Sequence, residues 1–270
     1  MDFIIDKNLI INNPKERKKS FEIIDGKLNP IILKDKKISF IGLSGGQASG
    51  KTKIANYVKK NVPKILIINE KDFFKIEYNN QNLKNESPYD NIDTYPRQRK
   101  KLITQLSNPL CYDYDKLYDC LKKLSNGEKV LIPHYDYNNY KIINNYLEIE
   151  PSKIKLVIVQ GYFIYKNANI RDLLDFKLYI EVDDDTRFSR LVLKESEYLD
   201  NKPNSFKEFF EIYQKYIKES FESNIRLYKK YANLMLANFE MDDTHEIDHG
   251  DDTLEFLVAN LKKLEKKIIK

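Results

Sequence analysis

Short apolar runs alternate along this chain with longer stretches of helical character. The runs that predict buried strands lie at residues 37–44, 65–69, 155–161, 176–183 and 232–238. Between and after them the pattern predicts helices at about 51–61, 114–125, 167–174, 185–198, 205–229 and 251–268. Continuous apolar strands separated by helices are typical of a parallel sheet covered by helices on both faces. The chain is therefore predicted to have an α/β fold with a mainly parallel sheet.

One segment departs from this alternation. Residues 130–150 read VLIPHYDYNNYKIINNYLEIE, in which aromatic, apolar and polar residues alternate. Such alternation predicts a β-hairpin that projects from the main sheet. The first 36 residues precede the sheet and carry two short apolar runs, so we interpret 1–36 as an N-terminal extension and 37–270 as the main domain.

The composition limits the possible functions. Hydrophobic residues make up 41% and charged residues 32% of the 270, and no apolar run approaches the roughly 18 residues of a membrane span. The chain start lacks the pattern of a secretory signal, so a cytoplasmic protein without membrane contact is expected. The net charge of +5 is small and the lysines are scattered, which disfavours nucleic acid as a partner. Cys111 and Cys120 fit neither a disulfide framework nor a zinc pattern, and we expect buried or idle thiols.

The 8 glycines of the chain are distributed unevenly. Gly42, Gly45, Gly46 and Gly50 fall within a few positions, in ISFIGLSGGQASGKT. Glycine at this density indicates that something approaches the backbone closely. The segment fits G-x-x-x-x-G-K-[ST] and lies between a predicted strand and a predicted helix, where a phosphate-binding loop (P-loop) occurs. A glycine turn that only caps a helix is the alternative.

This motif predicts binding of a nucleotide with Mg²⁺. Backbone N–H groups of the loop and the positive end of the next helix would bind the phosphates. Lys51 would reach the outer phosphates, and the Thr52 hydroxyl would be a ligand of Mg²⁺. The nucleotide-binding residues predicted from the motif are Gly45, Gly46, Gln47, Ala48, Ser49, Gly50, Lys51 and Thr52. The motif alone does not identify the reaction, because GTPases, motors and transport ATPases share it.

Further motifs resemble the uridine kinase family, with its relatives phosphoribulokinase, pantothenate kinase and nicotinamide riboside kinase. The matching stretches, in the family's order, are SGGQASGKT, KDFFK, GEKVLIPHYDYNNYK, VIVQGYF, VDDDTRFSRLVLKE and KKYANLMLAN. They extend from about residue 38 to 238. The resemblance implies a P-loop NTPase-type sheet, a hairpin at about 130–150, a lid at about 185–200 and a homo-oligomer.

Asp72 is the predicted catalytic base. It follows the second predicted strand, at the sheet edge where α/β folds bind ligands, and a carboxylate there can orient an acceptor hydroxyl toward the γ-phosphate. In the resembled family this aspartate is the base. The alternative is a helix N-cap, which is compatible with catalysis.

Arg187, Arg190 and Lys194 are spaced to share one helix face. Cations near the phosphate loop can stabilise a transferring phosphoryl group, and the family's lid has arginines that match Arg187 and Arg190. Lys194 stands where the family has arginine. The alternative is a solvated face paired with residues 183–185 and Glu195.

The resemblance places the acceptor site in the hairpin and in the segment before it. Tyr135 and Asp136 match the family's nucleoside contacts, Tyr140 stands where the family's base-reading histidine would be, and Asp113 matches a later aspartate. Strand alternation predicts that His134 points to the opposite face of the strand from Tyr135, and we interpret it as an ordinary surface or edge histidine. His245 and His249 are interpreted as part of a solvated loop.

The predicted metal ligands are Thr52, Asp72 and Gln160. The family's metal-binding glutamate aligns with Gln160, which removes a negative charge beside Mg²⁺. Three hypotheses remain open: an ATP-dependent kinase of a nucleoside, most simply the 5′-hydroxyl of uridine or cytidine; a kinase of another small metabolite, such as nicotinamide riboside; and a non-catalytic nucleotide-binding protein.

Overall fold

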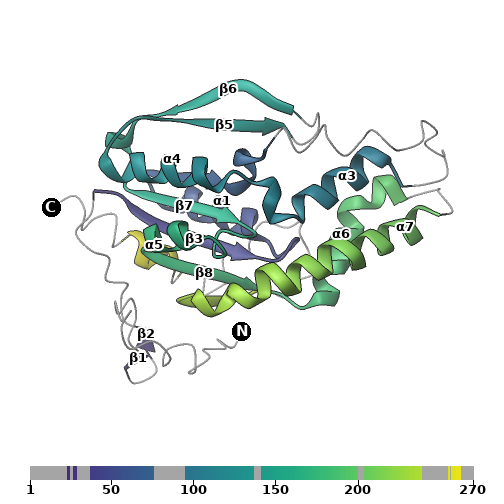
Figure 1. Cartoon of the computed structure of the whole chain (residues 1–270). Coiled ribbons are helices and arrows are strands. Elements are labelled where there is room, and N and C mark those ends of the chain that lie inside the picture. The colour runs from purple at the N-terminus through teal and green to yellow at the C-terminus, as the bar shows by residue number, and fades with distance from the viewer. Residues whose placement is uncertain are drawn as a thin grey trace.

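The protein is built around a five-stranded parallel sheet (Figure 1). The structure, a computed structural model, describes residues 37–75, 95–136, 141–199 and 204–238, with short pieces at 23–24, 27–28, 255 and 257–262. In the order β4-β7-β3-β8-β9, the strands are Ile65–Asn69, Leu156–Gly161, Ser39–Gly45, Phe176–Glu181 and Leu234–Ala237. The central strand β3 is buried along its whole length, which explains its continuous apolar sequence.

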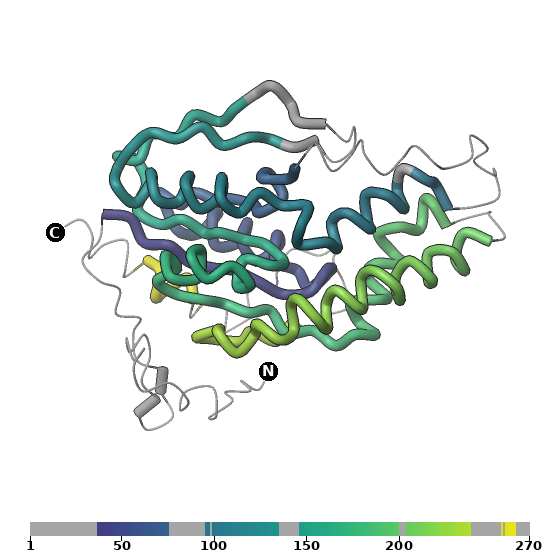
Figure 2. The backbone as a smooth tube through the Cα atoms, viewed as in Figure 1, coloured from purple at the N-terminus to yellow at the C-terminus, as the bar shows by residue number. Residues whose placement is uncertain are grey.

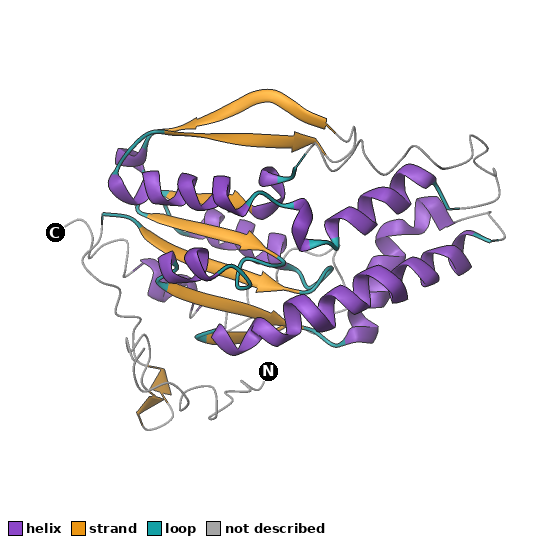
Figure 3. Cartoon of the chain, in the orientation of Figure 1, coloured by secondary structure: helices purple, strands orange, loops and turns teal. Residues whose placement is uncertain are grey.

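Helices cover both faces of this sheet (Figure 3). The labelled helices are α1 (Lys51–Asn61), α3 (Arg97–Leu106), α4 (Tyr114–Asn126), α5 (Ala168–Leu173), α6 (Asp184–Leu199) and α7 (Ser205–Ile212), and residues 257–262 are also helical. One hydrophobic cluster packs α4 and α5 on the sheet, and a second packs α1 and residues 257–261 on the other face. Short helical turns η2 (Glu70–Phe73), η3 (Pro109–Cys111) and η4 (Pro151–Lys153) join other elements.

The hairpin is a separate antiparallel pair, β5 (Val130–Asp136) with β6 (Lys141–Ile149). Its inner side chains Val130, Ile132 and Ile149 join the cluster that contains α4. A second small antiparallel pair, β1 (Ile23–Ile24) with β2 (Lys27–Leu28), precedes the sheet.

Helices α3, α6 and α7 extend together away from the sheet (Figure 1 and Figure 2). A third hydrophobic cluster joins α3, α6, α7 and η5 (Tyr213–Lys218), the helical segment that continues α7. Residues of η6 (Phe221–Ile225) and η7 (Arg226–Tyr231) then lead back to β9. The predicted lid segment, 185–200, thus belongs to a helical unit with its own apolar core.

The predicted α/β class, parallel sheet and hairpin are confirmed. Helix α1 has its predicted bounds, whereas the helix predicted at 205–229 is α7 followed by three helical segments with other hydrogen-bond patterns. Helix α3 was not predicted. The division into an extension (1–36) and a main domain (37–270) stays a prediction, because most of residues 1–36 lie outside the described part.

Candidate nucleotide-binding and phosphotransfer site

The loop at residues 45–50 joins the carboxyl end of β3 to α1. Its backbone turns sharply, with φ of 57° at Ala48 and 88° at Gly50, in the left-handed region that a non-glycine residue such as Ala48 rarely adopts. Gly50 is the N-cap of α1 and supplies no side-chain cap, and the first turn of α1 has no acidic residue. The positive end of α1 is therefore directed at the loop without a carboxylate to neutralise it.

Lys51 is buried beneath this loop. Its Nζ donates to the carbonyl oxygens of Gly45, at 2.9 Å, and Gly46, at 2.7 Å. Burial, and next the charge of Lys71, hold the pKa of Lys51 well below its ordinary range. The negative charge of a phosphate chain at this loop would offset both effects, as the predicted role of Lys51 requires.

Arg187 and Arg190 reach the loop from α6. A Cβ atom added to Gly46 would lie 2.5 Å from Arg187 Nη1, so the absence of a side chain at Gly46 lets this guanidinium approach the loop. Arg190 donates to Ala48 O and to Asn238 O, each at 3.2 Å. Both arginines are buried, and the structure therefore does not support the alternative of a solvated face for them.

The residues of the predicted lid face differ in burial and in the partners that they contact. Arg187 pairs with Asp184 and lies 3.6 Å from the centroid of the Phe221 ring. Lys194 is exposed. Glu195 is buried and pairs with Arg99 of α3 at 2.6 Å. The alternative that placed Glu195 on a solvated face is therefore not supported at this residue.

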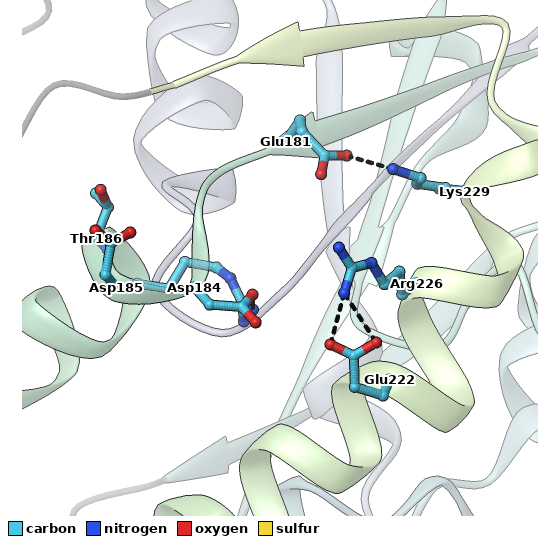
Figure 4. A network of polar contacts seen from close by, with 8 residues as sticks. Glu181, Asp184, Asp185, Thr186, Glu222, Arg226 and Lys229 are labelled. Carbon is cyan, nitrogen blue, oxygen red and sulfur yellow. Dashed lines mark hydrogen bonds and ion pairs between the residues drawn. The ribbon is translucent and has the colours of Figure 1, made fainter.

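A polar network surrounds the start of α6 (Figure 4). Glu181, at the end of β8, accepts from Lys229 at 3.4 Å, and Arg226 pairs with Glu222 at 2.8 Å. Asp184 and Asp185 begin α6 beside this network, where acidic residues suit the positive end of a helix. The contact between Glu181 and Lys229 connects the end of β8 with the segment that precedes β9.

The sequence interpretation missed Glu70, a fully buried carboxylate at the end of β4. Its oxygens accept from Tyr162 N at 2.6 Å, Phe163 N at 3.1 Å and the Tyr114 hydroxyl at 3.0 Å. Burial raises the pKa of Glu70 to about 7, although these three hydrogen bonds lower it. Glu70 therefore fixes the chain directly after β7, beside the phosphate loop.

Asp72 lies in the same turn, η2, but is directed elsewhere. Its Oδ1 is 3.8 Å from Nδ1 of His134 in the hairpin. His134 is exposed, as predicted, yet it faces Asp72 and belongs to the site's surroundings. The strongest charges acting on Lys51 come from Lys71 and then Glu70, the two neighbours that precede Asp72. The catalytic role of Asp72 remains a prediction.

Two of the predicted metal ligands, Gln160 and Thr52, have polar side-chain atoms that could contribute to a metal site. Gln160, the residue before the last of β7, donates its amide to Asn69, its register partner on β4. Its Oε1 is buried without a hydrogen-bond partner among the described residues, and the Thr52 side chain is exposed at the start of α1. An unpaired amide oxygen and a hydroxyl suit a hydrated Mg²⁺ that arrives with a nucleotide. No cluster of three or more His, Cys, Asp or Glu residues that could hold a metal occurs within the described residues.

The acceptor-site predictions are only partly located. Asp113 caps α4, accepting from Lys116 N at 3.0 Å, and its own N–H donates to Phe73 O in η2 at 2.7 Å. Tyr135 and Asp136 lie in β5, but their side chains are outside the described part. Tyr140 also lies outside it, as do His245 and His249. Cys111 and Cys120 are free and buried, as predicted.

A family model, "Phosphoribulokinase / Uridine kinase family", matches residues 40–245. The chain belongs to this family. Uridine kinase of Macrococcus caseolyticus is 28% identical over 201 residues, which cover 74% of this chain and 88% of that protein. Uridine kinase of Borrelia duttonii is 26% identical over 229 residues, or 85% of this chain and 97% of that one.

Solved structures agree on the fold. A candidate fructose transport system kinase from Silicibacter sp. TM1040 superposes with a TM-score of 0.53 at 16% identity, covering 74% of this chain and 89% of that one. The chain is thus a P-loop kinase of the phosphoribulokinase and uridine kinase family.

Within the described residues, no helix has the length and apolar character needed to cross a membrane.

Proposed function

We propose that this protein transfers the γ-phosphate of ATP to a hydroxyl group of a nucleoside, most simply the 5′-hydroxyl of uridine or cytidine. The observation that carries the proposal is the convergence of Lys51, Arg187 and Arg190 on one phosphate loop. Three cations from α1 and α6 around that loop suit a triphosphate whose outermost group gains charge as it moves. The similarity to proteins named uridine kinase supports the choice of acceptor.

In this proposal each element has a role. The loop and the positive end of α1 bind the phosphates, and α6 acts as a lid whose arginines exclude water and stabilise the transferring group. Asp72 accepts the proton of the acceptor hydroxyl, with His134 beside it. Mg²⁺, which would be held by Thr52, Gln160 and the phosphates, with Asp72 as a further candidate ligand, supplies charge neutralisation.

The decisive experiment is ADP release by the purified protein with Mg·ATP and uridine, cytidine, nicotinamide riboside or no acceptor. We expect release that depends on uridine or cytidine. Lys51→Met should abolish it, and Asp72→Asn should lower kcat by at least about 100-fold. Turnover with nicotinamide riboside alone would mean that this compound, and not uridine or cytidine, is the acceptor. ATP binding without turnover on any acceptor would favour the hypothesis of a non-catalytic nucleotide-binding protein.

Glu70→Gln is the matched control for Asp72→Asn, because it removes the neighbouring carboxylate of the same turn. If Asp72 is the base, Asp72→Asn loses far more activity than Glu70→Gln. Full activity in Asp72→Asn would show that the assignment is wrong.

A further inference from the structure

Two lysines from different elements meet at one aromatic ring beside the phosphate loop. The Lys51 ammonium group, from α1, lies 4.4 Å from the centroid of the Tyr162 ring. The Lys71 ammonium group, from η2, lies 5.2 Å from the same centroid. Tyr162 directly follows β7, so the ring brings together residues that are far apart in the sequence.

The backbone of Tyr162 is held from both sides. Its N–H donates to Glu70 at 2.6 Å, and its carbonyl accepts from the Ser44 hydroxyl at 3.1 Å. Gly161 is required for this approach, because a Cβ atom there would lie 2.6 Å from the Glu70 side chain. The Tyr162 backbone, from which the ring extends, is therefore held relative to β3 and η2.

Cations outnumber carboxylates among the described groups whose charges act most strongly on Lys51. These groups are the cations Lys71, Arg187 and Lys194 and the carboxylate Glu70. That carboxylate already accepts hydrogen bonds from two backbone N–H groups and one tyrosine. Like charges gathered in a partly buried site repel each other unless an anion joins them.

We propose that Lys71 is a second phosphate-binding lysine, which contacts the γ-phosphoryl group from the β4 side of the loop. This inference rests on the proposed function, in which the loop binds ATP. During transfer the bond between the γ-phosphorus and the β,γ-bridging oxygen breaks, and a bond to the acceptor oxygen forms while Asp72 takes the acceptor proton. Lys71 exchanges no proton; its charge stabilises the oxygens of the moving group.

The test compares the affinities of wild type, Lys71→Met and Lys75→Met for ATP and for ADP, by calorimetry. Lys75 is an exposed lysine just after the same turn, so Lys75→Met makes the same charge change away from the ring. We expect Lys71→Met to weaken ATP binding by about tenfold or more, the usual effect of one charge-assisted hydrogen bond, and to leave ADP binding within about twofold. Lys71→Arg should recover part of the loss.

Several outcomes would overturn the inference. Equal weakening of ATP and ADP, an equal effect of Lys75→Met, or unchanged ATP affinity in Lys71→Met would each exclude a γ-phosphate contact. In turnover assays, a raised KM for the acceptor with unchanged ATP affinity would place Lys71 at the acceptor instead. If wild type binds neither nucleotide, the proposed function itself fails, and the binding data separate that case from a failure of Lys71 alone.

Discussion

The burial of the Glu70 carboxylate makes the stability of the folded protein depend on pH. Its pKa in the folded protein is about 7, against an ordinary 4.5. As pH rises from 4.5, the unfolded chain loses this proton first, so the folded state binds more protons and its stability falls until about pH 7. The difference corresponds to about 3 kcal/mol at most.

Glu70→Gln should remove this pH dependence. A glutamine cannot ionise, yet its amide oxygen can still accept from Tyr162 N. Urea unfolding between pH 4.5 and 8 should show that the stability of wild type relative to Glu70→Gln declines with rising pH and is level above about pH 7. A constant difference across this range would mean that Glu70 titrates normally.

Gly161 is predicted not to tolerate a larger residue, because a Cβ atom at this position would overlap the Glu70 side chain. Gly161→Ala should destabilise the protein by about 1–3 kcal/mol through overpacking. In a Glu70→Gly background the same substitution should cost much less, because the Cβ, Cδ and Oε2 atoms of Glu70 that it meets are gone. Chemical denaturation of the four proteins of this cycle measures the coupling, and additive costs would contradict the proposed contact.

At the scale of elements, a buried ion pair joins α3 to α6. The Glu195 carboxylate accepts hydrogen bonds from Nε of Arg99 at 2.7 Å and from Nη2 of the same residue at 2.6 Å. It also accepts one from the Tyr95 hydroxyl at 2.5 Å. Arg99→Leu would leave a buried carboxylate without its cation and should cost about 3–5 kcal/mol. The exposed pair Arg226 and Glu222 is the matched control, and Arg226→Leu should cost at most about 1 kcal/mol. Equal costs in urea denaturation would show that the α3–α6 pair is no stronger than a surface pair.

The sequence predicted elements well where apolar periodicity was strong. The strands of the sheet and helices α1 and α4 came close to their observed bounds because their apolar positions face the two hydrophobic clusters that cover the sheet. Helix α3, with the sequence RQRKKLITQL, was missed because it is rich in basic residues and begins without a side-chain cap. The phosphate loop was predictable because its chemistry is local. Glu70, Lys71 and Tyr162 were not, because their proximity depends on the pairing of β4 with β7.

At the scale of the whole molecule, the residue that follows strand β9 is hydrogen-bonded to the phosphate loop. Asn238, directly after β9, donates its side-chain amide to Ser49 O at 3.0 Å and accepts from Arg190 through its carbonyl. Its amide also lies against Gly50, where a Cβ atom would collide with it. Helix α6, strand β9 and the loop thus meet in one set of contacts.

This arrangement predicts that Asn238→Ala weakens ATP binding by about threefold to tenfold, because the loop loses a hydrogen bond that fixes its shape. Asn233, at the opposite end of β9, accepts from Lys177 N at 2.9 Å and provides the control. Asn233→Ala removes a comparable hydrogen bond far from the loop, so it should lower stability by a similar amount and leave ATP affinity unchanged. Calorimetric titration with ATP, together with thermal unfolding of both variants, separates the two effects. Equal ATP affinities in the two variants would mean that the loop keeps its shape without the edge strand.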